Sequence, residues 1–218
     1  MNQPNRERKN EVGQLIQLNE EQKEAIRIIR DNQITIITGA TGSGKSAICA
    51  HYAVDILNKK EASRIYIARP TVEVGKSLGY IPGDLNAKLD PYFEAFLDNV
   101  YDTMKDKTKY AKWVTEEERF KFSAIQHIRG KTFNDLLVIE EGQNTSKKEM
   151  EAIVTRLGVK GKIIINGDLA QKDGPEHDGL SWLFNKIIAK VPEIKRIHLK
   201  ENHRSELVQK ILKAEYGE

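Results

Sequence analysis

Residues 39–46 read GATGSGKS, and the glycines, lysine and hydroxyl of this run suit the binding of a triphosphate. The run matches the pattern G-x-x-x-x-G-K-[ST] and lies between a β-branched run, residues 33–39, and a helical pattern over residues 46–60. Glycines in such a loop let backbone N–H groups curl around phosphates, helped by the N-terminus of the following helix. We therefore predict a phosphate-binding loop at this position.

The side chains of the loop have distinct expected roles. The Lys45 ammonium is predicted to lie against the β- and γ-phosphates, and the Ser46 hydroxyl is predicted to be a magnesium ligand. The alternative is a glycine-rich turn that matches by chance. The predicted nucleotide-binding residues of the loop are Gly39, Ala40, Thr41, Gly42, Ser43, Gly44, Lys45 and Ser46. The implied cofactors are ATP and Mg²⁺.

A second candidate site follows the apolar run of LLVIEEGQN, residues 136–144, which ends in two acids. Beside a phosphate-binding loop, one acid at a strand end commonly holds the metal, and a neighbouring acid orients and deprotonates the attacking water. We predict Glu140 as the metal-side acid and Glu141 as the general base. The alternative is a solvated strand end, since acids are common there.

A third polar turn follows the apolar run of INGDLAQ, residues 165–171. Asp168 and Gln171 are placed where they could reach the γ-phosphate or its water and couple hydrolysis to movement. An ordinary Gly-Asp turn is the alternative interpretation.

The elements that must position these residues alternate between strands and helices. Predicted strands lie at residues 33–39, 64–70, 135–140, 162–167 and 194–200, and predicted helices at 18–32, 46–60, 91–108, 146–157, 178–190 and from about 205. Asn19 is the expected N-cap of the first helix. Residues 71–91 are expected to form a long ordered loop. This alternation predicts an α/β domain with a mainly parallel sheet and right-handed crossovers.

Length and composition limit the remaining possibilities. The 218 residues are assigned to a flexible tail, residues 1–17, and one domain, residues 18–218. The single cysteine, Cys49, excludes a disulfide framework and a thiol zinc site. No apolar run approaches the ~20 residues that span a bilayer, and the N-terminus has no apolar signal region. We expect a cytoplasmic protein without a membrane segment.

Residues 105–131 are a candidate for nucleic-acid binding. The cations there are Lys105, Lys107, Lys109, Lys112, Arg119, Lys121, Arg129 and Lys131, set against four acids. The interleaved aromatics are Tyr110, Trp113, Phe120 and Phe122. Single-strand binders pair a basic groove with aromatic stacking platforms. The alternative is a solvated segment whose aromatics turn into the core.

Five stretches, in order, carry a family resemblance. They are GATGSGKS, ARPTVEVGKSLGYIPGDLNAKLDPY (68–92), IRGKTFNDLLVIEEGQN (128–144), TRLGVKGKIIINGDLAQKD (155–173) and ENHRSELVQKIL (201–212). The second stretch is the most specific of the five. Together they resemble the PhoH family of P-loop ATPases, whose core is similar to one RecA-like domain of superfamily 1 helicases. The resemblance implies a three-layer P-loop NTPase fold that binds ATP and magnesium.

The resemblance also assigns roles to individual residues. It implies that Glu140 and Glu141 correspond to the family's Asp-Glu pair, with Gln143 in the same motif. It also implies that Asp168 and Gln171 belong to a third helicase-like motif. By the same resemblance, Arg204 touches the γ-phosphate and Gln22 reads adenine. Two positions depart from the family pattern. Glu140 stands where aspartate is usual, and Gly142 stands where alanine is usual. We expect ATP binding to survive both changes and the hydrolysis rate to be the property affected.

Three functions are consistent with these residues. The leading hypothesis is an ATPase coupled to remodelling or unwinding of RNA or single-stranded DNA. The others are an ATP-binding oligomeric switch with little or no motor activity and a small-molecule kinase. Because one RecA-like core supplies only half of a helicase-type site, we expect a ring-like homo-oligomer, such as a hexamer, with Arg204 or Arg69 as the completing cation.

Overall fold

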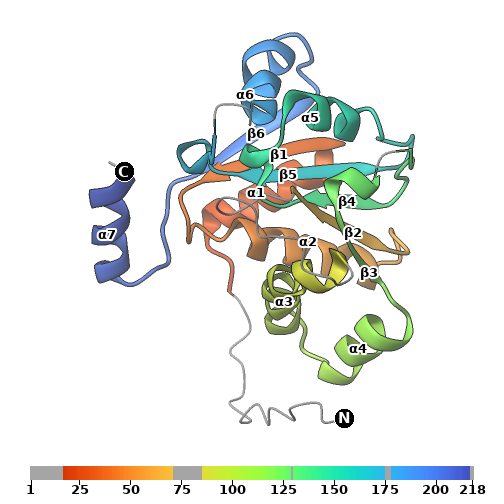
Figure 1. Cartoon of the computed structure of the whole chain (residues 1–218). Helices are drawn as coiled ribbons and strands as arrows, with labels where there is room; N and C mark the ends of the chain where they lie inside the picture. The colour runs from red at the N-terminus through yellow and green to blue at the C-terminus, as the bar shows by residue number, and fades with distance from the viewer. Residues whose placement is uncertain (1–16, 71–84, 129, 175–177, 217–218) are drawn as a thin grey trace.

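The computed structural model describes residues 17–70, 85–128, 130–174 and 178–216 of the chain (Figure 1). The predicted tail, apart from its last residue, lies outside these ranges. Most of the predicted loop at residues 71–91 lies outside them as well, and its last seven residues belong to a helix.

Six parallel strands form one sheet in the order β3-β2-β4-β5-β1-β6. Their bounds are β1 Ile34–Gly39, β2 Ile65–Arg69, β3 Phe120–Ala124, β4 Leu136–Ile139, β5 Lys162–Gly167 and β6 Ile194–Leu199. β5 lies between β4 and β1, so the segments that follow these three strands meet at one edge of the sheet. Those segments are the glycine-rich loop, the paired acids and the Gly-Asp turn.

Helices cover both faces of the sheet, which gives the three predicted layers (Figure 1). The helices are α1 Glu20–Asp31, α2 Lys45–Asn58, α3 Leu85–Thr103, α4 Lys107–Ala111, α5 Lys147–Val154, α6 Gly179–Trp182 and α7 Glu206–Tyr216. Shorter helical turns are η1 Lys112–Glu116, η2 Ile125–Ile128, η3 Gly142–Asn144, η4 Leu169–Gln171 and η5 Leu183–Ile188. One core packs α1, α2 and α3 on the sheet, and the other packs α5, α6 and η5. The central strands are apolar on both faces because both faces are buried.

Helix α1 begins as the sequence predicts. The Asn19 side chain accepts a hydrogen bond from the backbone of Gln22, and the Gln22 side chain accepts one from the backbone of Asn19. This reciprocal pair satisfies two of the helix's unpaired N–H groups. At the other end, the Lys162 ammonium donates to the carbonyl oxygens of Ile29, Arg30 and Asn32, so β5 holds the C-terminus of α1 in place.

Residues 105–131 contain α4, η1, η2 and the edge strand β3, which the sequence analysis did not predict. Trp113 and Phe120 are buried, and the Phe122 ring centroid lies 4.4 Å from that of Phe93 in α3. These rings are core residues and are not available as stacking platforms. Tyr110 also packs against this core, and its ring meets the Tyr101 ring edge-on.

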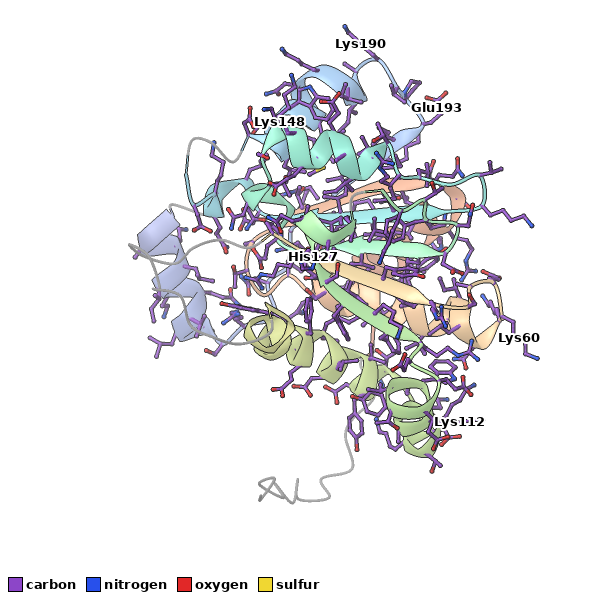
Figure 2. The ribbon with its side chains drawn as sticks, turned by 45° about the vertical axis from the view of Figure 1, so that its right-hand side comes forward. Lys60, Lys112, His127, Lys148, Lys190 and Glu193 are labelled. Atoms are coloured by element: carbon purple, nitrogen blue, oxygen red, sulfur yellow. The ribbon has the colours of Figure 1, made fainter. Side chains whose placement is uncertain are left out.

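Three cations of this segment are in ion pairs. Lys112 and Arg119 both pair with Glu117, and Lys121 pairs with Glu118. Figure 2 shows Lys112 beside α4, at the opposite end of β3 from His127. Because α4 and η1 precede β3, they lie at the amino edge of the parallel sheet, away from the glycine-rich loop. Ligands of open α/β sheets bind at the carboxyl edge, so this part of the segment is poorly placed for a nucleic-acid path coupled to the site.

Two helices differ from expectation or stand apart. Helix α3 begins at Leu85, ahead of the predicted start at Pro91. Helix α7 projects away from the sheet and its covering helices (Figure 1), and Leu207 and Ile211 on it are exposed. Within the described ranges, no helix combines the length and apolarity needed to cross a bilayer.

Candidate functional site

The glycine-rich loop joins β1 to α2, as predicted. Gly42 and Gly44 have φ of +91° and +88°, in the left-handed region that favours glycine. A Cβ atom at Gly42 would lie 2.5 Å from Cγ of Arg204, so the Arg204 side chain packs directly over this glycine. The Lys45 ammonium donates to the carbonyl oxygens of Gly39 at 2.5 Å and Ala40 at 3.0 Å, which holds it over the loop.

The predicted metal-side acid lies next to the predicted metal-binding hydroxyl. The Ser46 hydroxyl donates to Oε2 of Glu140 at 2.7 Å, and the Asn166 amide donates to Oε1 of the same carboxylate at 2.7 Å. Asn166 is 2% exposed and also accepts a hydrogen bond from the Glu141 backbone N–H, at 3.3 Å. One buried amide on β5 therefore positions both acids that follow β4.

Burial dominates the electrostatics of Glu140. It raises the pKa of this carboxyl, and the nearby Glu141 charge raises it further. Hydrogen bonds from Ser46 and Asn166, together with the Arg69 charge, act in the opposite direction. The Asn166 amide also donates to the sulfur of buried Cys49 at 3.8 Å, and burial raises the pKa of this thiol well above the ordinary value. The free thiol is therefore a buried packing residue rather than a reactive group.

Glu141 is held in an unusual backbone conformation. Its φ of +54° and ψ of 42° lie in the left-handed region, which costs a non-glycine residue about 1–3 kcal/mol. The Asn144 N–H donates to the Glu141 carbonyl oxygen at 3.0 Å and closes the turn of η3. Backbone strain of this kind clusters at functional sites, and here it directs the chain away from β4 immediately after the first acid.

A chain of hydrogen bonds connects Glu141 to the glycine-rich loop. The Gln143 amide donates to Oε2 of Glu141 at 2.6 Å and its oxygen accepts from the Asp168 N–H at 3.0 Å. The Gln171 amide then donates to Oδ2 of Asp168 at 2.7 Å and to the Thr41 hydroxyl. Asp168 and Gln171 thus lie beside the loop and the acids.

The segment that precedes α7 lies across the loop. The Asn202 amide donates to the Thr41 carbonyl oxygen at 3.1 Å, and the His203 N–H donates to the Gly42 carbonyl oxygen at 3.0 Å. These two bonds place Arg204 over Gly42, at the rim of the site. The position predicted from sequence for Arg204 therefore lies beside the loop.

Gln22 also lies beside the loop, with its amide nitrogen close to Gly44. Both of its polar atoms are engaged: the amide oxygen accepts from the Asn19 N–H at 3.1 Å, and the amide nitrogen lies 3.3 Å from Nε2 of His203. In this arrangement Gln22 ties α1 to the segment before α7. Contact with adenine stays a prediction.

A cavity of about 480 Å³ collects most of these residues. Three cations line it, Lys45, Arg69 and Arg204, together with the carboxylates Glu140 and Glu141. Helix α3 forms the wall opposite the loop, and the Arg69 guanidinium lies 3.9 Å from the ring centroid of Tyr92 on that helix. The cavity has the mixed charge expected of a triphosphate site, with basic groups for phosphates and acids for a metal and water.

The oxygen donors at the cavity fit Mg²⁺. Ser46 and Glu140 supply a hydroxyl and a carboxylate, the hard ligands that this ion prefers. No group of three or more His, Cys, Asp or Glu side chains suited to a metal occurs in the described part of the chain. A magnesium ion would accordingly be held by these two residues with phosphate and water oxygens completing its shell.

Asn166 and Tyr92 lie at the site but were not among the residues predicted from the sequence. Asn166 carries a signal, because it is the one polar side chain that interrupts the apolar run IIIN of β5. Tyr92 has no such signal, since it is one of several aromatics in a helical pattern. Its proximity to Arg69 depends on the packing of α3 against β2.

Known proteins resemble this chain in sequence. The profile of the PhoH-like protein family matches residues 14–216. A PhoH-like protein of Synechocystis sp. is 31% identical over 198 residues, which cover 88% of this chain and 60% of that protein. The PhoH-like protein of Bacillus subtilis is 32% identical over 198 residues, with 88% and 61% covered. The chain thus spans about three fifths of the length of these relatives.

Known structures resemble its fold. The large terminase from a thermophilic bacteriophage superposes with a TM-score of 0.59 at 15% identity, over 92% of this chain and 50% of that one. Its complex with ADP gives a TM-score of 0.57 at 12% identity, over the same shares of the two chains. This likeness shows the fold alone, and it confirms the predicted P-loop NTPase architecture. With the family profile covering nearly the whole chain, the sequence resemblance is confirmed as well: the chain belongs to the PhoH-like protein family.

Proposed function

We propose that this chain binds ATP with Mg²⁺ and hydrolyses it, and that it couples hydrolysis to remodelling of RNA or single-stranded DNA. The observation that carries the proposal is the shared cavity of Lys45, Ser46, Glu140 and Glu141. Family membership supports nucleotide hydrolysis, and the terminase of the same fold has been solved with ADP and with ATP-gamma-S.

Each residue has a defined task in this proposal. The loop N–H groups and Lys45 bind the β- and γ-phosphates, and Ser46 and Glu140 hold the metal. Bound there, Mg²⁺ neutralises charge on the phosphate oxygens. Glu141 orients a water for in-line attack on the γ-phosphorus and accepts its proton, while Gln143 fixes the carboxylate through the bond to Oε2. The cleaved bond joins the γ-phosphorus to the bridging oxygen, and the products are ADP and phosphate.

The coupling part of the proposal rests on the relay through Gln143, Asp168 and Gln171. Because this relay connects Glu141 to Thr41 of the loop, a change at the γ-phosphate can be transmitted to the segment before α7, which also bonds to Thr41. Nucleic acid as the partner rests on the family resemblance to helicase cores. The segment at residues 105–119 contributes no support, since Trp113 is buried, Tyr110 packs against the core, and α4 and η1 lie at the amino edge of the sheet.

Phosphate release with a panel of RNA and DNA stimulators tests the proposal. We expect release that needs Mg²⁺ and increases with RNA or single-stranded DNA. Lys45→Ala should lose ATP binding, whereas Glu141→Gln should bind ATP and fail to cleave it. The proposed catalytic base is wrong if Glu141→Gln hydrolyses at the parental rate, and the ATPase proposal is wrong if the parental protein neither binds nor cleaves ATP.

A second candidate function is an ATP-binding oligomeric switch with little turnover. The observation that favours it is the placement of Glu140, because its longer side chain already bonds directly to Ser46 and Asn166. A carboxylate held this way can contact magnesium at a shifted position and slow cleavage. Tight ATP binding with negligible release, unaffected by nucleic acid, would favour the switch. Sedimentation with ATP and Mg²⁺ tests the ring-like assembly proposed for either function.

A further inference from the structure

We infer that Arg69 is a catalytic cation supplied by the same chain that carries Glu141, and that Tyr92 is the positioning residue that holds its guanidinium at the cavity. This inference rests on the proposed ATPase function and deepens it. Its consequence is that the chemical step needs no arginine from a neighbouring subunit.

The fold places Arg69 beside the acids. Arg69 is the last residue of β2, and β2 pairs with β4, with Ala68 opposite Ile139. The Glu140 N–H donates to the Ala68 carbonyl oxygen at 2.9 Å, which extends this pairing to the first acid. Arg69 and Glu140 therefore leave adjacent strands side by side at the carboxyl edge, and both line the cavity.

Arg69 and Arg204 approach the cavity from different sides. In the sheet order, β2 lies on one side of the acid-bearing strand β4, and β1 with its loop lies on the other side beyond β5. Arg204 packs over Gly42 on the loop side. Arg69 lies on the side of the acids, where Glu141 would hold the attacking water. A cation there faces the phosphoryl oxygens that gain charge during cleavage.

Tyr92 presents the guanidinium in a useful orientation. The Arg69 Cζ atom lies 3.9 Å from the Tyr92 ring centroid, a close cation–π contact on helix α3. Stacking occupies the flat face of a guanidinium and leaves its N–H groups at the edges for phosphate oxygens. Tyr92 is 46% exposed although the neighbouring Phe93 and Phe96 are buried, and its ring lines the cavity in contact with Arg69.

The charge balance of the cavity supports this role. The lining residues Lys45, Arg69 and Arg204 set three positive charges against two carboxylates. Lys45 is committed to the loop, where it bonds to two carbonyl oxygens and serves the β- and γ-phosphates. The two arginines remain as the bidentate donors that suit a phosphoryl group in transfer. Both come from this chain.

Kinetics of single variants test the role of Arg69. We expect Arg69→Ala to bind a fluorescent ATP analogue within about threefold of the parental affinity and to lose about 10²- to 10³-fold in kcat. Arg69→Lys should recover only part of this loss, because an ammonium lacks the planar fork. Tyr92→Phe should be unaffected, and Tyr92→Leu should lower kcat without changing ATP affinity. Arg64→Ala, immediately before the first residue of the same strand, is the matched control and should behave like the parent.

A mixing experiment separates supply within the chain from supply by a neighbour. Arg69→Ala and Glu141→Gln proteins are each inactive for different reasons. If a neighbour supplied Arg69, mixed assemblies would contain sites with both an intact Glu141 and an intact Arg69, and activity would return. We expect mixtures to stay as inactive as the separate variants. Recovered activity would overturn the inference.

Two further outcomes distinguish failure of the Arg69 role from failure of the ATPase proposal. If Arg69→Ala and Arg69→Lys are both folded by circular dichroism and turn over at the parental rate, Arg69 has no catalytic role and the ATPase proposal stands. If the parental protein itself does not cleave ATP, the ATPase proposal and this inference both fail.

Discussion

Replacing Asn166 tests whether one buried amide positions both acids. In Asn166→Ala the carboxylate of Glu140 loses its donor at 2.7 Å, and the Glu141 backbone N–H loses its acceptor at 3.3 Å. Ser46 still donates to the other oxygen of Glu140. The variant therefore leaves Oε1 of Glu140 and the Glu141 N–H without these hydrogen bonds. The bond from the predicted metal-binding hydroxyl of Ser46 stays in place.

The geometry sets the size of the effect. A hydrogen bond to a charged acceptor contributes about 1.5–3 kcal/mol, and the longer bond from the Glu141 backbone about 0.5–1 kcal/mol. Asn166→Ala should thus lower the free energy of unfolding by about 2–4 kcal/mol. Removing a group that orients a metal ligand typically costs about 10- to 100-fold in metal affinity. We expect the Mg²⁺ concentration for half-maximal turnover to increase by that factor.

Asn166→Asp provides a sharper comparison because it keeps the shape and exchanges the donor for a carboxylate beside Glu140. Two buried acids at this distance cannot both ionise, so the pair should retain a proton in the folded state. A carboxyl whose pKa is raised by folding favours the folded state at low pH, and this stabilisation is lost as pH rises through the raised pKa. Asn166→Asp should be close to the parent at acidic pH and progressively destabilised toward neutral pH.

The assays are urea denaturation across pH and magnesium titration of phosphate release, with Asn58→Ala on the exposed end of α2 as the control. The proposed positioning role is refuted if Asn166→Ala keeps the parental magnesium dependence while losing stability, since a purely structural asparagine would behave that way. A pH-independent loss of stability in Asn166→Asp would contradict its direct contact with Glu140.

Three further variants test neighbouring parts of the structure. Gly142→Ala should lower the free energy of unfolding by about 1–3 kcal/mol in urea denaturation, because the added Cβ would lie 2.7 Å from Cγ2 of Ile165. Glu140→Gln should be more stable than the parent at neutral pH, and its free energy of unfolding should depend less on pH. Burial raises the pKa of Glu140, so the stabilisation from its protonated form is lost as pH rises through that pKa. An unchanged dependence of stability on pH would refute this. Lys162→Met should cost about 1–3 kcal/mol of stability through the carbonyl groups of α1 that it leaves unpaired, with exposed Lys160→Met as the control.

The parts of the fold predicted from sequence are those with strong local signals. The loop over residues 39–46, the acids after an apolar run and the capping box at Asn19 are each specified within a few residues. Strands β1, β4 and β5 were identified because strands buried on both faces are continuous apolar runs. The strand order of the parallel sheet then brings the three polar segments together at its carboxyl edge.

Edge strand β3 was missed for the opposite reason. Its sequence, FKFSA, is short and carries a lysine, and charges flank it on the N-terminal side. The alternation of Phe120 and Phe122 was a usable period-two signal, since both rings turn toward the core that contains α3. In the sequence analysis the same aromatics entered the nucleic-acid hypothesis, because composition alone does not distinguish a stacking platform from a half-buried strand.

The contacts of Asn166 could not be predicted, because they depend on which strands are neighbours. β4 and β5 align Ile139 with Ile165, so the next residues, Glu140 and Asn166, lie at the same level on adjacent strands. Because of this register, the longer side chain that the family resemblance marks as unusual at position 140 reaches the Asn166 amide. The additional methylene of Glu140 lets its carboxylate span the distance between the Ser46 hydroxyl and the Asn166 amide.

Gly142, the second position at which the family resemblance implies a departure, belongs to the same arrangement. A Cβ at this position would also lie 3.0 Å from the Asn166 carbonyl oxygen, so the glycine lets the turn after the acids pack directly on the end of β5. Alanine would push that turn away from β5 and stretch the bonds through which Asn166 holds Glu140 and the Glu141 backbone. Glu140 and Gly142 are therefore linked through their contacts with Asn166. Glu140→Asp alone should shorten the side chain and separate its carboxylate from the Asn166 amide, while the turn at Gly142 stays packed on β5.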